Sequence, residues 1–116
     1  MIEDEEILNL FVEPQSQGKA FELLISKYEK KVYWLIRRMV IDHDDATDLT
    51  QETFIRIWHN LDGFKKESKL YTWMYRIASN EALSFLRKKR RYTFIPFNDV
   101  EAELEKNLTI TWRRRQ

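Results

Sequence analysis

The 116-residue chain is 43% hydrophobic and has only two glycines and two prolines, a composition that favours long helices over a turn-rich β-fold. The absence of cysteine excludes disulfides and thiolate metal sites, and the acidic N-terminus and short apolar runs match neither a signal peptide nor a membrane span. Residues 1–60 carry 7 basic and 12 acidic side chains, whereas residues 61–116 carry 13 and 7. We therefore expect an all-α, cytoplasmic protein without direct membrane insertion, whose halves face different partners.

The first 40 residues predict a short helix followed by a long one. Apolar residues around Ile7 favour the short helix, which residues 14–18 interrupt, with Ser16 as a candidate N-cap for the next helix. From about 19 to 40, apolar residues recur at three- and four-residue steps. Trp34 falls outside this stripe, so we expect it to contact another helix or a partner. The expected core-facing stripe is Phe21, Leu24, Ile25, Tyr28, Val32, Leu35, Ile36 and Met39.

A second long helix is predicted to start at the acidic run 42–45. This run supplies an N-cap and negative charge at the positive end of the helix dipole. We expect the helix to end around residues 62–63. Its expected core-facing stripe is Ala46, Thr50, Phe54, Ile57 and Leu61.

A third long helix is predicted after the basic loop 64–68, with Ser68 as a candidate N-cap, and runs into the basic residues 87–91. Its expected stripe is Leu70, Trp73, Met74, Ile77, Ala78 and Phe85. The pattern thus predicts a compact bundle of three long amphipathic helices plus a short N-terminal helix, over residues 1–91 with a core at 19–91. Beyond Tyr92 the periodicity fails, so residues 94–97 are expected to be extended and residues 92–116 to form a linker or tail.

Motifs for catalysis are nearly absent. The chain has no glycine-rich phosphate loop, no His-Glu-x-x-His and no thiol, and its two histidines lie far apart in sequence. The acidic group at 42–48 lacks the glycine and spacing of a calcium loop, and helix capping explains it better. We therefore expect no enzyme activity, no metal and no cofactor.

The outer face of the second helix combines acids with an apolar residue. Asp48, Glu52, Ile55 and His59 follow at steps of four, three and four, with Gln51 beside them and opposite the core stripe. A solvated acidic face is one interpretation. An exposed isoleucine among acids is more typical of a protein-docking patch.

The third helix and the loop before it combine basic, aromatic and amide side chains. Arg76, Asn80 and Arg87 lie opposite the core stripe, where Asn80 could bind a base edge or be a merely tolerated polar residue. Aromatic and basic residues interleave around the loop, which suits unpaired bases, although Trp73 also fits the core. The candidate DNA-binding residues are Phe64, Lys65, Lys66, Lys69, Tyr71, Trp73, Tyr75, Arg76, Asn80, Arg87 and Lys88.

Three segments together resemble a known family. Asp45–Trp58, Leu61–Phe64 and Tyr71–Asn80, followed by an Arg-Lys run, are similar to region 2 of a sigma-70-family factor of the extracytoplasmic-function group. The resemblance covers roughly residues 19–91. It implies a helical domain that attaches to core RNA polymerase and recognises the promoter −10 element, capturing non-template single-stranded DNA during transcription initiation.

The resemblance also implies roles for individual residues. Asp48, Gln51, Glu52 and Ile55 fall in the segment that grips the clamp helices of the polymerase beta-prime subunit. The loop 64–69 corresponds to the pocket for a flipped base, Asn80 to a base-contacting position, and Arg76, Arg87 and Lys88 to phosphate contacts. The loop lacks the glycine often found there, so base preference does not transfer.

The resemblance has consequences for partners and chain organisation. In this family an anti-sigma factor often masks these surfaces, so such a partner is expected. A second domain, region 4, has no counterpart in this sequence, which suggests a fragment or a shortened member. The competing hypothesis is a helical protein-interaction adaptor, for which only the acidic face would be functional. An RNA-binding or repair enzyme would need a catalytic constellation that the sequence lacks.

Overall fold

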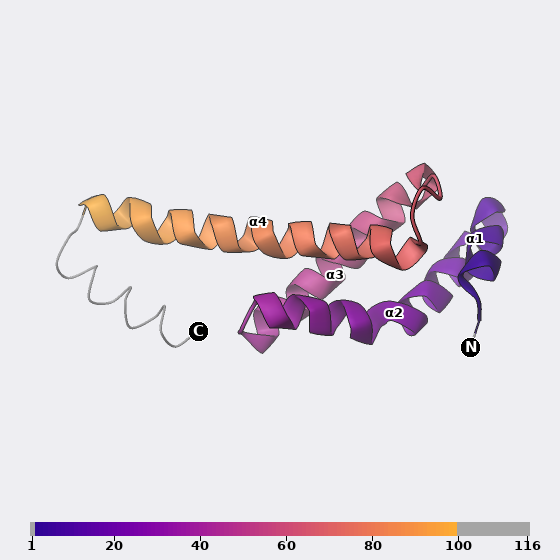
Figure 1. The fold of residues 1–116 in the computed structure, drawn as a ribbon, viewed down its shortest axis with the longest axis horizontal. Helices are drawn as coiled ribbons and strands as arrows, with labels where there is room; N and C mark the ends of the chain where they lie inside the picture. Colours follow the sequence, from indigo (N-terminus) through magenta and orange to yellow (C-terminus); the bar gives the residue numbers. More distant parts are fainter. Residues whose placement is uncertain (1, 100–116) are drawn as a thin grey trace.

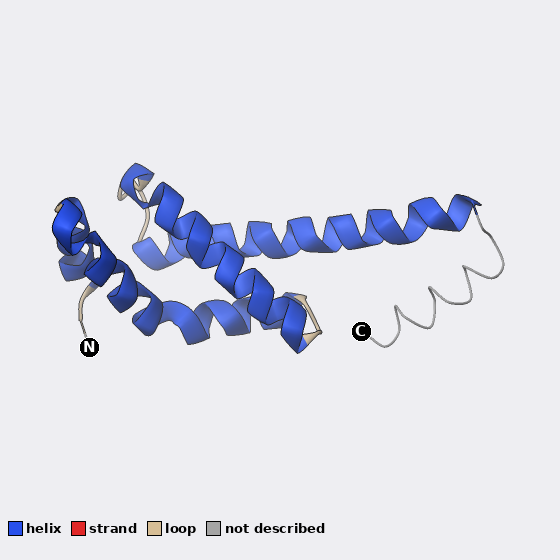
Figure 2. Ribbon diagram, turned by 180° about the vertical axis from the view of Figure 1, so that it is seen from behind, coloured by secondary structure: helices blue, strands red, loops and turns tan. Residues whose placement is uncertain are grey.

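The computed structural model describes residues 2–99, with side chains placed as far as Arg90. All regular secondary structure in this part of the chain is helical, with no strand, which confirms the all-α prediction. Figures 1 and 2 show α2 and α4 alongside each other, with α3 crossing behind both in Figure 1 and in front in Figure 2. The elements are α1 (Asp4–Val12), the 3-10 turn η1 (Pro14–Ser16), α2 (Gln17–Met39), α3 (His43–Asn60), the 3-10 turn η2 (Leu61–Gly63) and α4 (Leu70–Asp99).

The helix starts follow local hydrogen bonding, and one cap was predicted correctly. The Asp42 carboxylate accepts hydrogen bonds from the backbone N–H groups of Asp44 (2.8 Å) and Asp45 (3.2 Å), which caps α3 as expected. The predicted Ser68 cap is wrong, because its hydroxyl donates to the Lys69 carbonyl (3.2 Å) and α4 begins only at Leu70.

The Ser16 prediction is right in position but wrong in side-chain bonding, because Ser16 is the N-cap residue of α2 and its hydroxyl does not cap that helix. Its hydroxyl makes no capping bond to α2 and instead donates to the Leu10 carbonyl at 2.5 Å. The Gln17 amide donates likewise to the Phe11 carbonyl at 3.0 Å. These side chains satisfy carbonyls of the last turn of α1, which have no partner within that helix. The Ser16 side chain therefore stabilises the end of α1, while the residue itself stands at the N-cap position of α2.

One hydrophobic core joins the four helices. The stripe predicted for α3 and η2 is entirely buried, and Ile7 of α1 is fully buried as well. On α2, by contrast, Phe21, Ile25 and Met39 are only half-buried, at the edge of the predicted stripe. The buried core is Ile7, Ala20, Leu24, Tyr28, Val32, Leu35, Ile36, Val40, Ala46, Leu49, Phe54, Ile57, Leu61, Leu70, Met74, Ala78 and Ala82.

The last helix is longer than the sequence pattern predicts. It continues to Asp99, so the expectation of extended backbone at 94–97 is wrong. Proline removes one backbone hydrogen bond, but its φ of about −65° is itself helical, and here the helix passes through Pro96. Residues 100–116 of the predicted linker lie outside the described residues. Within residues 2–99, no helix combines the length and hydropathy that a bilayer span requires.

Candidate functional site

The acidic surface of α3, defined as Asp48, Gln51, Glu52 and Ile55, faces solvent as predicted. All four side chains are exposed, and Ile55 keeps 51% of its surface accessible. Behind them the helix packs inward, where the buried Thr53 hydroxyl donates to the Leu49 carbonyl at 2.7 Å. The surface thus presents an apolar side chain surrounded by polar and acidic groups on a rigid helix.

Next to the acidic surface lies a groove between α2 and α3. It has a volume of about 610 Å³, and Gln51 and Ile55 form one of its walls. Phe21 and Ile25 of α2 form the opposite wall. A second hollow of about 430 Å³ continues past Ile55 to Trp58. Ile55 therefore borders an apolar trough formed by two helices.

The sequence pattern placed Phe21 and Ile25 in the core and did not identify this groove. Phe21 contacts two aromatic rings of α3, with centroid separations of 6.5 Å to Phe54 and 5.0 Å to Trp58. Phe21 and Ile25 are nonetheless half-buried rather than buried. The sequence did contain a signal for this groove, namely the width of the apolar stripe on α2. The stripe is wider than contact with one neighbouring helix can bury, so residues at its edge are left partly exposed.

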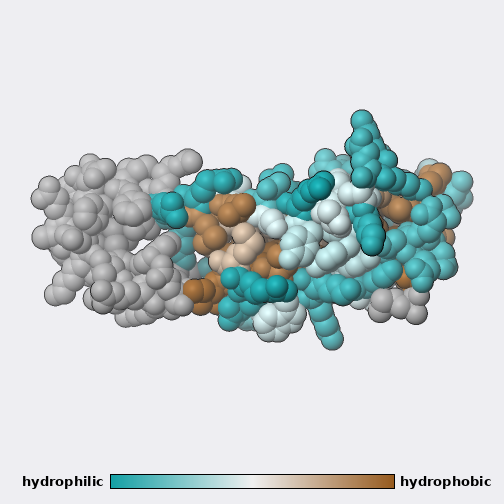
Figure 3. Space-filling view, viewed as in Figure 1, coloured by the Kyte–Doolittle hydropathy of each residue, from teal (hydrophilic) through white to brown (hydrophobic). Residues whose placement is uncertain are grey.

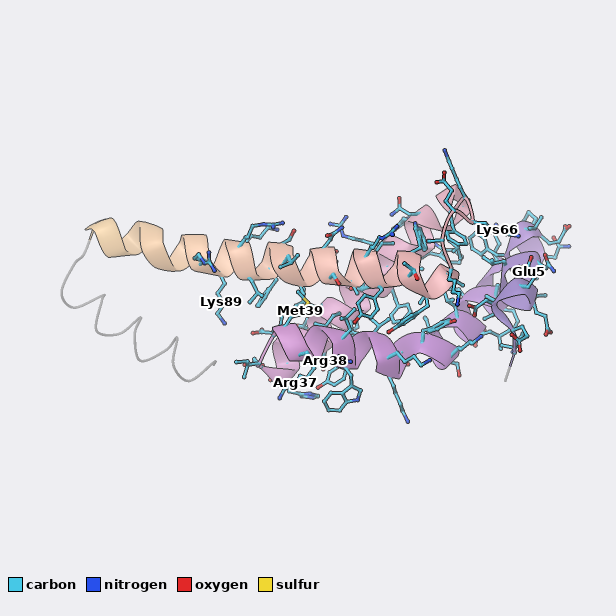
Figure 4. All side chains as sticks on the ribbon, viewed as in Figure 1. Glu5, Arg37, Arg38, Met39, Lys66 and Lys89 are labelled. Carbon is cyan, nitrogen blue, oxygen red and sulfur yellow. The ribbon has the colours of Figure 1, made fainter. Side chains whose placement is uncertain are left out.

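The loop between η2 and α4 carries basic residues on an aromatic base. Phe64 and Trp73 pack against each other with centroids 5.2 Å apart, and both are half-buried. Lys65 and Lys69 are exposed. Lys66 adopts a left-handed backbone conformation with φ 61°, and its ammonium donates to Glu5 of α1 at 3.1 Å. Figure 4 shows Glu5 and Lys66 at the same end of the bundle.

The exposed face of α4 carries the predicted row of cationic and amide side chains. Arg76, Asn80, Arg87 and Lys88 are all exposed. The spacing of the first three, four and seven residues apart, places them on one side of the helix. Within the described part of the chain, no carboxylate pairs with Arg76, Arg87 or Lys88. Their charges are therefore available to an anionic partner.

Tyr71 and Tyr75 lie apart from that row, on the side of α4 that faces α2. Tyr71 stacks on Tyr28 with centroids 5.5 Å apart and an interplanar angle of 18°, and Tyr75 meets the Tyr71 ring edge-on at 5.2 Å. Burial raises the pKa of the Tyr71 phenol, Tyr75 adds to the rise and Arg38 opposes it. The structure thus divides the predicted DNA-binding residues between two faces of α4.

Among residues 2–99, no three His, Asp or Glu side chains are grouped closely enough to hold a metal ion. The side chains with potential for binding are instead the acidic surface with its groove, the loop, and the row on α4.

Comparison with known proteins identifies the family. The Sigma-70 region 2 family model matches residues 24–92. The ECF RNA polymerase sigma-E factor of Haemophilus influenzae is 41% identical over 96 residues, which cover 83% of this chain and 49% of that protein. The RNA polymerase sigma-H factor of Pseudomonas aeruginosa is 44% identical over 85 residues, which cover 73% and 43%. The chain thus spans about half the length of the curated relatives it matches.

A solved structure shares the fold. The NMR structure of an engineered region 2 of sigmaE in complex with GTAAAA superposes with a TM-score of 0.67 at 36% identity, covering 78% of this chain and 93% of that one. The family match spans more than half of the chain, and both the curated relatives and the solved structure agree with it. The chain therefore belongs to the sigma-70 family, as a region 2 domain of the extracytoplasmic-function type.

Proposed function

We propose that the chain binds core RNA polymerase and recognises a promoter −10 element, capturing non-template single-stranded DNA during transcription initiation. The observation that carries the DNA-binding part is the exposed row of Arg76, Asn80 and Arg87 on α4, whose arginines pair with no carboxylate of the described residues. It is supported by the solved region 2 of sigmaE, whose complex contains GTAAAA.

The side chains near α4 divide into those that bind phosphates and those that bind bases. Arg76, Arg87 and Lys88 neutralise backbone phosphates, which fixes the register of the strand without selecting a sequence. The Asn80 amide offers a donor and an acceptor to a base edge. At the loop, the packed rings of Phe64 and Trp73 form one side of a pocket for an unstacked base.

Base capture is energetically feasible only on a strand that is already opening. Stacking on an aromatic ring contributes about 1 to 3 kcal/mol per base, and extracting a base from a duplex costs a few kcal/mol. One pocket and a few phosphate contacts therefore hold an exposed base but do not melt a duplex. We propose that polymerase binding supplies the rest, so the two surfaces act together.

The acidic surface and its groove are the proposed polymerase-binding site. An amphipathic helix that places apolar side chains between α2 and α3 would contact Phe21, Ile25 and Ile55. Asp48 and Glu52 then form a charged rim that favours a basic partner. The clamp helices of the beta-prime subunit are the proposed occupant.

This role needs no catalytic group or cofactor in the chain, since the polymerase performs nucleotidyl transfer. It places the protein in the cytoplasm, with promoter DNA and core polymerase as partners. An anti-sigma factor that covers the same surfaces completes the proposed set of partners.

Fluorescence anisotropy with a fluorescein-labelled GTAAAA hexamer tests the DNA-binding part. We expect Arg76→Ala and Arg87→Ala each to weaken binding and to reduce the salt dependence by about 0.7 log units per log unit of salt. Asn80→Ala should reduce the ratio between the affinity for GTAAAA and the affinity for a shuffled hexamer. Lys19→Ala, an exposed lysine at the start of α2, is the matched control.

The outcomes separate this proposal from the adaptor hypothesis. If the hexamer shows no measurable binding at low salt, or binds the Arg76→Ala/Arg87→Ala double variant equally well, the DNA-binding role is wrong. The α2–α3 groove would then favour a protein-interaction adaptor.

A further inference from the structure

A second basic row runs along α2, with a tryptophan in its middle. Lys27, Lys31, Trp34 and Arg38 follow at steps of four, three and four, which aligns them along one side of the helix. Trp34 is 57% exposed, more than Trp58, the other exposed tryptophan within residues 2–90, at 37%. Tyr33 meets its ring edge-on, with centroids 5.0 Å apart.

The cations in this row are not all equally available. Lys27 is engaged, because its ammonium donates to the Asp4 carboxylate at 2.7 Å and to the Ile2 carbonyl at 2.8 Å. Lys31 and Arg38 are exposed, and neither forms an ion pair within residues 2–90. Glu29, the acidic residue nearest in sequence to Lys31, lines the α2–α3 groove instead. Two cations beside Trp34 thus remain available for an anion.

The row continues onto α4 through aromatic rings. The Lys31 ammonium lies 5.6 Å from the Tyr71 ring centroid and 5.9 Å from that of Tyr28, so it sits over both stacked rings. Tyr75 packs edge-on against Tyr71. Tyr71 lies in the first turn of α4, separated from the loop 64–69 by Leu70. The α2 row therefore contacts the first turn of α4, which comes just after the loop in the chain.

Figures 3 and 4 place this surface in the molecule. The face shown is largely hydrophilic, with hydrophobic side chains gathered between α4 and the C-terminal end of α2. Arg37 and Arg38 lie at that end of α2, away from Glu5 and Lys66 at the other end of the bundle. A strand that leaves the loop along α2 would therefore pass Lys31 and Trp34 before reaching Arg38.

We infer that Lys31, Trp34 and Arg38 form a second binding surface for single-stranded DNA, which holds nucleotides beyond the −10 hexamer. This inference rests on the proposed function and extends it. Cations beside an exposed aromatic ring suit a single strand, because the cations bind phosphates and the ring stacks on any base. Base stacking is tolerant of sequence, so this surface contributes affinity for strand length and not for a particular base.

Probes of different length test the inference. Binding of labelled GTAAAA is compared with that of two decamers, GTAAAATTTT and TTTTGTAAAA, so that either strand polarity is detected. We expect one decamer to bind at least about fivefold more tightly than the hexamer, as one stacked base predicts. Its salt dependence should exceed that of the hexamer by about 1.4 log units per log unit of salt if two further phosphates are neutralised.

Surface variants assign the gain to these residues. Trp34→Ala should abolish most of the decamer gain, and Lys31→Ala/Arg38→Ala should abolish the added salt dependence, while hexamer affinity stays unchanged in both. Trp34→Phe, which keeps an aromatic ring, should retain most of the gain. Lys19→Ala is again the charge control, and circular dichroism checks that each variant folds.

Each alternative outcome has a distinct meaning. Equal affinity for hexamer and decamers, or a gain that the variants retain, overturns the inference and leaves the proposed function intact. Absence of binding to all three probes overturns both. If Trp34→Ala weakens binding to core RNA polymerase but not the decamer gain, the surface serves a protein partner and the inference is wrong.

Discussion

One carboxylate fastens the start of α1 to α2, and its contribution to stability can be measured. The Tyr28 hydroxyl lies 2.7 Å from both carboxylate oxygens of Asp4, and the Lys27 ammonium lies 2.7 Å from Oδ1. Tyr28 itself is only 5% exposed. We therefore predict that Tyr28→Phe and Asp4→Ala both destabilise the protein and that their effects are coupled.

The geometry sets the expected magnitudes. A hydrogen bond to a charged group contributes about 1.5 to 3 kcal/mol. The Asp4 side chain keeps 32% of its surface exposed, and Lys27 still pairs with it in Tyr28→Phe, so we expect that variant to lose about 1.5 kcal/mol. Asp4→Ala also leaves a buried hydroxyl without its acceptor, which raises the expected loss to about 2 to 3 kcal/mol.

A double-mutant cycle by urea denaturation measures the coupling. The double variant should lose about 1 to 1.5 kcal/mol less than the sum of the single variants, because the Tyr28–Asp4 bond is then counted once. Thr53→Val, at another buried hydroxyl, provides a partner for a cycle with Asp4→Ala in which no coupling is expected. A Tyr28–Asp4 coupling below about 0.3 kcal/mol would refute the role assigned to this carboxylate.

Three further predictions concern pH, the loop and the core. Burial and Asp4 raise the pKa of the Tyr28 phenol in the folded protein. The stability that Tyr28 contributes is therefore complete below pH 10, the ordinary pKa of tyrosine, and is lost as the pH rises further. Urea denaturation at several pH values between 9 and 11 should show wild type losing stability faster than Tyr28→Phe. Lys66→Gly should raise the unfolding free energy by about 0.5 to 1 kcal/mol. The left-handed backbone conformation costs a residue with a side chain about 1 to 2 kcal/mol, and the exposed Lys66–Glu5 ion pair that is lost stabilises the protein by less than that. A lower urea midpoint would contradict this. Met74→Ala, at a fully buried site, should cost about 2 to 5 kcal/mol and lower Tm in calorimetry, and a loss below about 1 kcal/mol would mean that Met74 is not in the core.

The long-range pattern of the fold was predictable because each helix has one buried side. The stripe Ala46, Thr50, Phe54, Ile57 and Leu61 repeats at helical spacing, and the structure buries all five residues. The Asp42 cap was also predictable, since the carboxylate bonds to N–H groups only two and three residues away. Local chemistry of this kind depends little on the rest of the chain.

Features that depend on the partner element were not predictable. Ser16 is suitable for capping the helix after it, yet its hydroxyl reaches back six residues to the Leu10 carbonyl. The sequence assigned Pro96 to an extended segment, whereas α4 passes through it. Each expectation followed a common preference of the residue type, the serine side chain for capping the next helix and proline for non-helical backbone. In neither case does the structure follow that preference.

The candidate surfaces show the same division. Helical spacing correctly placed Asp48, Glu52 and Ile55 on the exposed side of α3. It could not show that Phe21 continues that surface, because this requires the relative placement of α2 and α3. Composition grouped Tyr71 with the basic row, although its ring stacks on α2. The assignment of individual residues to DNA or polymerase stays a prediction.

Binding to core RNA polymerase tests the central claim most directly. The 116-residue chain, labelled with a fluorophore, is titrated with core enzyme alongside Asp48→Arg/Glu52→Arg and a matched control, Glu6→Arg/Glu13→Arg. The acids of the control are also exposed but do not line the α2–α3 groove. The account predicts that wild type and control bind and that the α3 variant does not. Equal binding by all three, or no binding by the wild-type chain, would contradict it.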